Sequence, residues 1–327
     1  MIIILSVEND FTTLEIVNWL TLYKAKYKVL YPNNFLLNTT FEDLSYHGVQ
    51  KYIEEKIECA ISEVNVIWCR KWGVKSIVRE NYISDLEFEN NKAVYLSSLA
   101  EIQEINSLLL SFFPKEKVVN SFIDSKASKL NQLLLANKVG LKTPQTKVLS
   151  RKTHLEKFLK EAQYGLITKP MHEVFSMKIG NEFYTTYTSR VKLVQTNSDS
   201  FLPSMFQTEI KKKFEIRTFV YGNQFYSMAI FSQSNKQTEV DFRRYDQVTP
   251  NRNSKYKLPQ DIQDKIQLLL GELQLKTASI DFIVDQDDQH IFLEVNPYGQ
   301  FGMVSKPNNY NLEQKFAKYL MSYVPIN

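Results

Sequence analysis

The chain has 327 residues, 43% of them hydrophobic and 13% aromatic, which is enough for two or three domains with packed cores and argues against global disorder. The 40 basic and 36 acidic residues give a formal net charge of +4, so the composition gives no reason to expect a nucleic-acid partner, which usually shows a clustered basic face. The first apolar run, in MIIILSVEND, is far shorter than a membrane span and lacks a basic flank and a cleavage site. We therefore expect neither a signal peptide nor a membrane anchor.

The first third of the chain alternates between strand and helix patterns. Residues 2–7 are a continuous apolar run, which is typical of a buried parallel strand, and Ile16, Leu20 and Tyr23 then follow helical spacing. A strand at 28–32, a helix near 49–61, a strand at 64–70 and a helix through Leu99–Phe112 repeat the theme. This order predicts an α/β domain with a parallel sheet over residues 1–116.

A second part begins with a predicted helix over 126–139, capped by Asp124 or Ser125 and ended by Gly140. Ala127, Leu130 and Leu134 would form its apolar face. Strands dominate after this helix, at 145–149, 165–169, 174–179, 182–188, 206–210, 214–221, 224–232, 278–284 and 289–295, with helices at 153–163, 259–273 and 311–323. Gly180-Asn181 and Gly222-Asn223 predict hairpin turns, and 189–204 is expected to be a flexible connection or the edge of a lid.

The segment TASIDFIVDQDDQHIFLEVNPYGQFG, residues 277–302, carries the strongest chemical signal. If Asp287 and Asp288 form a two-residue loop, Asp281 lies opposite Glu294, and Asn296 shares the face of Glu294 because alternate strand residues point the same way. Such oxygen ligands suit Mg²⁺. The alternative is an ordinary polar sheet face, but a carboxylate inside an apolar run is unfavourable unless it is paired or metal-bound. We therefore favour a metal site.

Basic residues suggest an anion site without establishing one. Lys169 ends the apolar run LIT, and Lys126 stands where a helix N-terminus favours an anion. FEIRTFVYG places Glu215 and Arg217 on one strand face, and VDFRRYD does the same for Asp241 and Arg243. Arginine suits phosphate and carboxylate, but ordinary cross-strand salt bridges explain these pairs equally well.

Several common site signatures are missing. There is no G-x-x-x-x-G-K-[ST] loop and no G-x-S-x-G elbow, and the four histidines have no metal-like spacing. Cys59 and Cys69 show neither a C-x-x-C pair nor zinc spacing. We expect two buried, unreactive thiols in a cytoplasmic protein, because a reducing compartment leaves cysteines unpaired.

Five motifs follow one another within residues 124–297: DSKASKLNQLLLANKVGLKTPQT, LITKP, FQTEIKKKFEIRTFVYG, SIDFIV and FLEVNP. Their order resembles that of the ATP-grasp superfamily. More narrowly, FSQSNKQTEVDFRRYD, PNRNSKYKLP and FLEVNPYGQFGMVS resemble the grasp-with-spasm peptide maturases, relatives of the microviridin ligases. The similarity of the opening segment and of VIWCRKW extends the resemblance over nearly the whole chain.

The resemblance implies an ATP-grasp fold with an N-terminal parallel-sheet domain (1–116), a central lobe (117–204) and a C-terminal lobe with the metal site (205–327). It implies ATP and Mg²⁺ as cofactors. By position, the family's site residues correspond to ATP-binding Lys126, Lys169, Gln207, Glu209, Ile210 and Glu215, to catalytic Arg217 and Arg243, less securely to Arg244, and to metal ligands Asp281, Glu294 and Asn296.

The implied activity is that of a macrocyclase acting on a ribosomal precursor peptide. An Asp or Glu side chain would be activated as an acyl phosphate and joined to Thr, Ser or Lys as an ω-ester or ω-amide. The leader peptide is expected near the hairpin 174–188, and a homodimer is possible. One alternative is an ATP-grasp ligase for a small amino acid or a protein terminus. The other is a non-enzymatic binding module, which would be expected to lack a metal ligand or a phosphate lysine.

Overall fold

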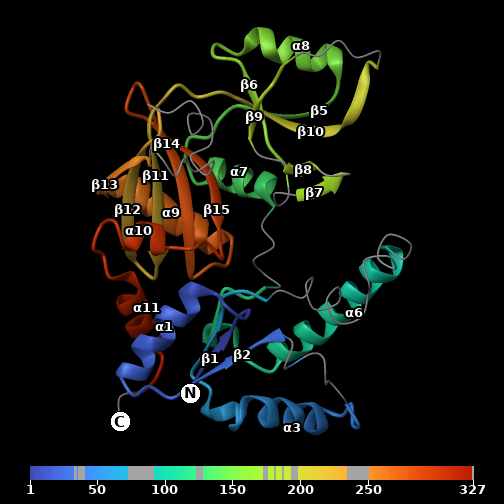
Figure 1. Cartoon of the computed structure of the whole chain (residues 1–327), viewed down its shortest axis with the longest axis vertical. Coiled ribbons are helices and arrows are strands. Elements are labelled where there is room, and N and C mark those ends of the chain that lie inside the picture. The colour runs from blue at the N-terminus through green and yellow to red at the C-terminus, as the bar shows by residue number, and fades with distance from the viewer. Residues whose placement is uncertain are drawn as a thin grey trace. The chain divides into compact units, whose positions relative to one another are not determined.

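The computed structural model describes residues 1–32, 35, 41–72, 92–122, 128–171, 176–179, 182–185, 188–192, 198–233 and 250–325. The chain divides into two compact units (Figure 1). The first contains residues 1–126, 274–277 and 297–327, and the second contains residues 127–273 and 278–296. The second unit holds sheets that the sequence assigned to separate central and C-terminal lobes, so the three-part division stays a prediction.

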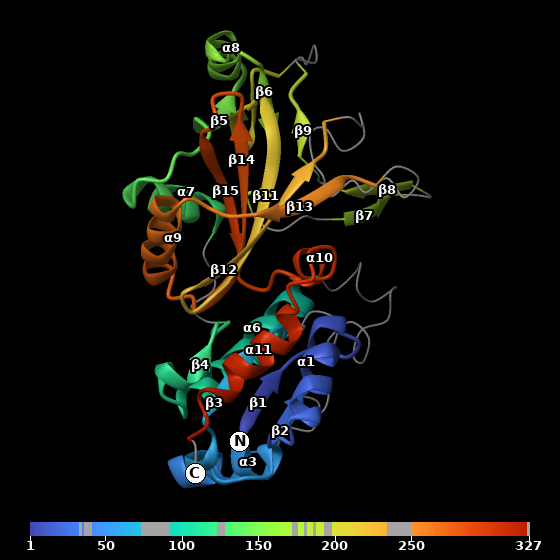
Figure 2. The same ribbon diagram turned by 90° about the vertical axis from the view of Figure 1, so that its left-hand side faces the viewer.

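The first unit is built on a parallel sheet, as predicted. Strands β1 (Ile2–Leu5), β2 (Tyr27–Leu30), β3 (Val66–Cys69) and β4 (Val118–Val119) are arranged in the order β2-β1-β3-β4. Helices α3 (Tyr46–Ile57) and α6 (Lys92–Ser111) cover one face, and α1 (Phe11–Leu22) and α11 (Leu312–Met321) cover the other (Figure 2). Shorter helices are η1 (Ile61–Glu63), η2 (Lys115–Lys117) and α10 (Gly302–Ser305).

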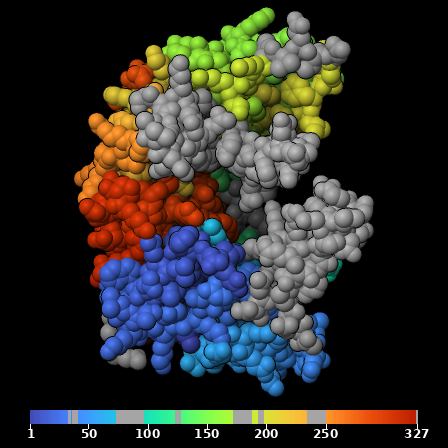
Figure 3. Space-filling model, viewed as in Figure 1, coloured from blue at the N-terminus to red at the C-terminus, as the bar shows by residue number. Residues whose placement is uncertain are grey.

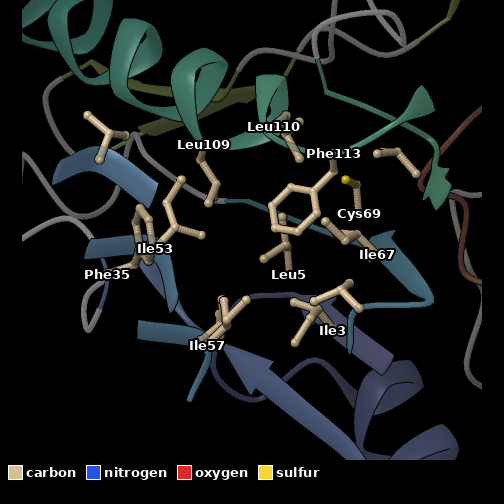
Figure 4. Close-up of a cluster of buried hydrophobic side chains, with 14 residues drawn as sticks. Ile3, Leu5, Phe35, Ile53, Ile57, Ile67, Cys69, Leu109, Leu110 and Phe113 are labelled. Atoms are coloured by element: carbon tan, nitrogen blue, oxygen red, sulfur yellow. The ribbon is translucent and has the colours of Figure 1, made fainter. Parts of the chain in front are cut away.

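Alternation along the strands separates the two cores of this unit. Ile3 and Leu5 of β1 pack with Ile53 of α3 and Phe113 in the cluster beneath α6 (Figure 4). Trp68 points to the opposite face, where its ring lies 4.9 Å from that of Phe316 in α11. The pattern follows from the two-residue period of a strand, which sends neighbouring apolar side chains into both helix layers.

The cysteines behave largely as expected. Neither forms a disulfide bond, and Cys69 is buried in the sheet core while Cys59 is half-buried. Burial raises the pKa of the Cys59 thiol, which makes it a poor nucleophile at neutral pH. No helix in the described ranges combines the length and the apolar character that crossing a bilayer requires.

The second unit contains two larger antiparallel sheets and a hairpin. One sheet has the order β5 (Thr146–Arg151), β10 (Ser200–Thr208), β6 (Leu166–Thr168), β9 (Ser189–Arg190). Helix α8 (Lys152–Glu161) packs on one face through Leu155 and Phe158 against Leu166 and Phe206, and it forms the surface at the top of Figure 3. Strands β7 (Ser176–Ile179) and β8 (Glu182–Thr185) form the hairpin.

The other sheet has five strands. Their order is β13 (Arg252–Tyr256), β12 (Gln224–Phe231), β11 (Lys212–Tyr221), β14 (Thr277–Asp285), β15 (His290–Asn296). Helix α9 (Gln260–Glu272) packs on one face, and α7 (Lys129–Lys138) contacts the edge strand β15 (Figures 1 and 2). The predicted hairpin turn at Gly222-Asn223 is confirmed, since Tyr221 pairs with Gln224 and Gly222 has φ +49°.

The structure differs from the sequence predictions in three places. The segment 189–204 contains β9 and the start of β10, where Ser200 pairs with Arg151, so it is not simply a flexible connection. Strand β13 has the polar sequence RNSKY and was not predicted. Both strands are held by backbone pairing while many of their side chains remain exposed, and hydrophobic alternation cannot detect such strands.

The third difference concerns α7. Its N-cap is Ser128, whose hydroxyl accepts from the Asn131 N–H, so the predicted caps Asp124 and Ser125 were wrong. Its buried residues are Gln132, Leu133 and Ala136, whereas the predicted core residue Leu134 is 69% exposed. A polar side chain occupies a position that the pattern had assigned to the solvated face. Gly140, with φ +82°, ends the helix as predicted.

Candidate active site

A tight turn at Gln286, Asp287 and Asp288 joins the two strands of the acidic hairpin, β14 and β15. The Asp285 N–H donates to the Gln289 carbonyl (3.1 Å), and the Asp288 N–H donates to the Asp285 carbonyl (3.2 Å). Asp288 adopts a left-handed conformation with φ +59°. This is a three-residue loop with a left-handed last residue, so the predicted two-residue loop was wrong.

The residues nearest the turn pair one position away from the predicted register. Phe282 is opposite Phe292, whereas a two-residue loop would place it opposite Leu293. The register then shifts between Phe282 and Asp281, so that Asp281 is opposite Glu294, as predicted. Leu293 is the extra residue of this β-bulge. The bulge lets Phe292 and Glu294 serve opposite faces, although they stand two residues apart.

One face of the bulged hairpin is the core and the other carries the charged groups. Phe282 and Phe292 are fully buried, with ring centroids 5.8 Å apart. On the other face Asp281 lies across from Glu294, and Asn296 lies across from Ser279. Asp281 is buried and Asn296 is exposed. The predicted juxtaposition of the two carboxylates is therefore confirmed, while their role as metal ligands stays a prediction.

Arg217, on β11, lies beside this carboxylate pair. Its Nη1 lies 3.6 Å from Asp281 Oδ2, and both side chains are buried. Its Nε is buried without a hydrogen-bond partner among the residues that the structure describes. A buried guanidinium N–H without an acceptor is energetically costly. The Nε–H of Arg217 can therefore donate a hydrogen bond to an anionic ligand.

Glu215 stands on the same strand face but does not pair with Arg217. It accepts from Lys212 Nζ (2.7 Å) and Ser232 Oγ (2.9 Å). Burial raises the pKa of the Glu215 carboxyl, and this effect outweighs the opposing contributions of Lys212 and Ser232. Arg217 thus pairs with Asp281 on β14, whereas Glu215 is held by Lys212 at the start of β11 and by Ser232, so these two buried charges do not neutralise each other.

Glu294 approaches a lysine that the sequence analysis did not single out. Lys129 Nζ lies 3.8 Å from Glu294 Oε2 and donates to the Pro170 carbonyl (3.2 Å). Lys212 and Ser232 were missed in the same way. Their spacing gave no signal, except that Lys212, at the first position of β11, stands three residues before Glu215.

A magnesium ion fits the donor set of the hairpin. The described part of the chain contains no group of three His, Cys, Asp or Glu side chains that could hold a metal. The candidate set instead combines the carboxylates of Asp281 and Glu294 with the amide of Asn296. Mg²⁺ accepts such a set, because it is usually held by one or two carboxylates and completes its shell with phosphate oxygens and water. A structural zinc ion, which favours Cys and His, does not fit.

A second group of predicted residues lies on the sheet that carries α8. Gln207 is buried, and its Nε2 donates to Thr146 Oγ1 (2.9 Å). Because the Thr146 hydroxyl donates its proton to the Pro144 carbonyl (2.9 Å), it can only accept from Gln207. The orientation of the amide is therefore fixed. Its Oε1 is left as a buried acceptor with no partner among the described residues.

Other predicted residues are less well defined. Lys169 directly follows β6 and is half-buried, and Ile210 is half-buried between β10 and β11. Glu209 is held in a two-pronged ion pair by Arg190, with a shortest distance of 2.7 Å. Lys126, Arg243 and Arg244 lie outside the described residues. The same holds for the side chains of the hairpin proposed to contact a leader peptide.

The comparisons with known proteins extend these observations. Residues 124–320 match the family model of the RimK-like ATP-grasp domain. The macrocyclase MdnC of Microcystis aeruginosa MRC, bound with the precursor peptide MdnA, is 22% identical, with a TM-score of 0.74 over 98% of this chain and 99% of that chain. A RiPP-associated ATP-grasp ligase of Chryseobacterium gregarium, in complex with ADP and a leader and core peptide, is 22% identical, with a TM-score of 0.74 over 99% and 97%.

The ATP-grasp ligase PsnB, complexed with a minimal precursor, Mg and ADP, is 16% identical, with a TM-score of 0.74 over 99% of this chain and 97% of that chain. No curated protein matches the sequence. The likeness in fold extends over nearly the whole chain in each of these structures. It confirms the ATP-grasp fold that the order of sequence motifs implied.

Proposed function

Since this chain belongs to the RimK-like ATP-grasp domain family, whose model spans residues 124–320, we propose that it is an ATP- and Mg²⁺-dependent ligase. It would activate a side-chain carboxylate of a ribosomal precursor peptide and join it to a hydroxyl or an amine of the same peptide. One observation carries the proposal: a buried arginine, Arg217, stands beside a carboxylate, Asp281, that faces a second carboxylate, Glu294, across a hairpin.

The chemistry requires activation because an ionised carboxylate has no adequate leaving group. Its oxygen attacks the γ-phosphorus of ATP, the bond to the bridging oxygen breaks, and an acyl phosphate and ADP result. A hydroxyl or amine then attacks the acyl carbon, the C–O bond to phosphate breaks, and the nucleophile loses its proton. Each ester or amide formed therefore removes one water from the peptide. Most of the catalysis is positioning and charge stabilisation.

Arg217 would bind and orient the oxygens that carry charge during both steps. Its buried Nε–H and its planar fork suit a phosphoryl or carboxylate oxygen. Asp281, Glu294 and Asn296 would hold Mg²⁺, which when bound neutralises phosphate charge and orients the phosphates. Lys126, Lys169 and Arg243 would add positive charge, and Glu215 would keep Lys212 in place through their 2.7 Å contact.

Gln207 would help to select the base of the nucleotide. Its Oε1 is a buried acceptor in a fixed orientation, which suits the amino group of adenine and would repel the carbonyl that guanine has at the same position. Glu209 and Ile210 adjoin this position in sequence and would complete the adenine side.

The peptide substrate is proposed by analogy. Structures of similar fold contain a precursor peptide, in MdnC, or a leader and core peptide, in the Chryseobacterium gregarium ligase. We propose that the β7–β8 hairpin region contacts the leader. A cytoplasmic homodimer is part of the same proposal, and analytical ultracentrifugation checks its oligomeric state.

The deciding experiment measures the intact mass of a candidate precursor peptide after incubation with the protein, ATP and Mg²⁺. We expect ATP-dependent loss of one water per ring. Asp281→Asn and Glu294→Gln should abolish this loss while thermal unfolding stays cooperative. Asp288→Asn, in the exposed turn of the same hairpin, is the matched control and should keep full activity.

Two results would contradict the proposal in different ways. An unchanged peptide mass, with ATP hydrolysed when free amino acids are offered, would assign the chain to small-molecule ligases. Full activity of Asp281→Asn would exclude the assigned metal ligands.

A further inference from the structure

We propose that Gln132 is a positioning residue for the strand that carries the metal ligands: its amide holds the backbone of Val295 and thereby fixes the direction of Glu294 and Asn296. This inference rests on the proposed function, because it concerns the same metal site. Nothing in the sequence pattern or in the motif resemblance assigns a role to Gln132.

The contact between the two residues is two-pronged. Gln132 Nε2 donates to the Val295 carbonyl (3.0 Å), and the Val295 N–H donates to Gln132 Oε1 (2.8 Å). The side chain is only 4% exposed. The paired donor and acceptor define which end of the amide faces which backbone group. Gln132 therefore acts on β15 as one residue of a neighbouring strand would.

The position of the contact is what gives it a functional meaning. Val295 stands between Glu294 and Asn296, and its own side chain is buried in the core. Strand β15 lies at the edge of the sheet, and the two hydrogen bonds to Gln132 show that both backbone groups of Val295 point away from β14. Holding this residue fixes the two neighbours whose side chains leave the opposite face.

A second anchor lies on the same edge. The Phe292 N–H donates to the Lys142 carbonyl (2.7 Å). The edge of β15 is thus held at Phe292 and at Val295, on either side of the bulge residue Leu293 and of Glu294. A bulge bends its strand and alters the direction of nearby side chains, so anchors on both sides define that direction.

Helix α7 approaches the same strand through another side chain. Lys129, one turn before Gln132 on the same helix face, places its Nζ 3.8 Å from Glu294 Oε2. Helix α7 therefore contacts the backbone of β15 through Gln132 and the carboxylate of Glu294 through Lys129. An apolar residue would suit a buried position on α7, as Leu133 and Ala136 do. Gln132 is polar at such a position, and its amide forms two hydrogen bonds with the backbone of the edge strand β15.

The test separates positioning from ordinary structural support. Gln132→Met keeps the length of the side chain and removes both hydrogen bonds. Gln132→Asn keeps the amide but shortens its reach, and it provides a milder variant if Gln132→Met does not fold. Gln263→Met is the matched control, since Gln263 stands on helix α9 and donates to a backbone carbonyl, that of Leu258 (2.8 Å), outside the metal hairpin.

Three measurements are made on the full chain. Calorimetry gives the affinity for Mg²⁺ in the presence of ADP and the affinity for ADP alone. Hydrogen exchange follows the Val295 amide, and thermal unfolding reports stability. We expect both Gln132 variants to bind Mg²⁺ about tenfold more weakly, as is typical when a residue that orients metal ligands is lost. The Val295 amide should exchange faster and ADP affinity should stay within about twofold, since the base side of the site is untouched. Gln263→Met should lower only stability.

A folded Gln132 variant with the Mg²⁺ affinity of the unaltered protein would overturn the inference and leave Gln132 a purely structural residue. Failure of the unaltered protein to bind Mg²⁺ with ADP would instead contradict the proposed function. The two failures are therefore distinguishable.

Discussion

Asp281 and Glu294 face each other across β14 and β15, although the residues between them and the turn are paired one position out of that register. The bulge at Leu293 compensates for the three-residue loop. The result is a hairpin that buries Phe292 in the core and still directs Glu294 to the face of Asp281 and Arg217. Two irregularities, one in the loop and one in the strand, together produce the regular opposition that the sequence suggested.

Deletion of Leu293 tests the role of the bulge. The pairs on either side, Phe282 with Phe292 and Asp281 with Glu294, can form without the extra residue, so the protein should fold and lose about 1–3 kcal/mol of unfolding free energy. The local bend is lost, so Mg²⁺ binding in the presence of ADP should weaken about tenfold. Calorimetry measures this. Leu293→Ala keeps the extra backbone residue and should keep the affinity. Equal affinities in both variants would show that the bend has no role in binding.

Asn120 holds the two ends of the same hairpin within the first unit. Its Nδ2 donates to the carbonyls of Thr277 (2.7 Å) and Pro297 (2.9 Å), and its Oδ1 accepts from the N–H groups of Lys276 (3.1 Å) and Thr277 (3.3 Å). Asn120→Ala should lower the unfolding free energy by about 2–4 kcal/mol, because it leaves buried backbone groups unpaired. Denaturant titration measures the loss.

The backbone of Asn120 provides an internal comparison. Its φ is +57°, a left-handed conformation that glycine adopts readily and alanine does not. Asn120→Gly should therefore be less destabilising than Asn120→Ala by about 1 kcal/mol. Asn18→Ala, at an exposed position of α1, is the control and should change stability little. A small effect of Asn120→Ala would show that the hairpin ends are held by other contacts.

The raised pKa of the Glu215 carboxyl predicts that the stability of the protein depends on pH. Burial raises the pKa of its carboxyl in the folded protein above that of the unfolded chain, which is about 4.3. Its contribution to stability is therefore fully present below about pH 4.3 and is lost as the pH rises through the folded pKa. Glu215→Gln should remove this loss, so its stability relative to the unaltered protein should increase across that window. Denaturation at a series of pH values measures it, and parallel curves would contradict the prediction.

Lys212 supplies a second variant for the same experiment. It lies 2.7 Å from the Glu215 carboxylate and favours the charged form. Lys212→Met should raise the folded pKa of Glu215 further and extend the window to higher pH. No such extension would mean that Lys212 has little influence on Glu215.

The fixed, buried Oε1 of Gln207 predicts that the protein selects ATP over GTP. Gln207→Leu should weaken ATP binding by about 1–3 kcal/mol, or roughly fivefold to 150-fold, because an adenine amino group loses its acceptor. GTP binding should change less, so the ATP:GTP ratio of affinities falls. Thr146→Val tests the orientation argument, since it leaves Gln207 in place but removes the hydroxyl that orients the amide. Selectivity that survives both substitutions would exclude Gln207 from base recognition.

Several structural features of this protein follow from its local sequence. The apolar run of β1 predicted a buried parallel strand, and the turn at Gly222-Asn223 follows from backbone preferences. Counting residues placed Asp281 opposite Glu294, although the three-residue loop and the bulge that together produce this pairing were not predicted, and the order of motifs implied the fold. These features depend on periodicity and on short sequence separations, which can be read along the chain. The assigned roles of the site residues and the domain boundaries stay predictions.

Tertiary structure decided the rest. Arg217 could have paired with Glu215 on its own strand, but it lies beside Asp281, and Glu215 is held by Lys212 and Ser232. Gln132 and Asn120 looked like ordinary polar positions, yet each binds backbone groups more than 150 positions away in the chain. A sequence pattern reports burial and spacing. It does not report which distant backbone donors and acceptors lack a partner, and buried polar side chains are placed by that requirement.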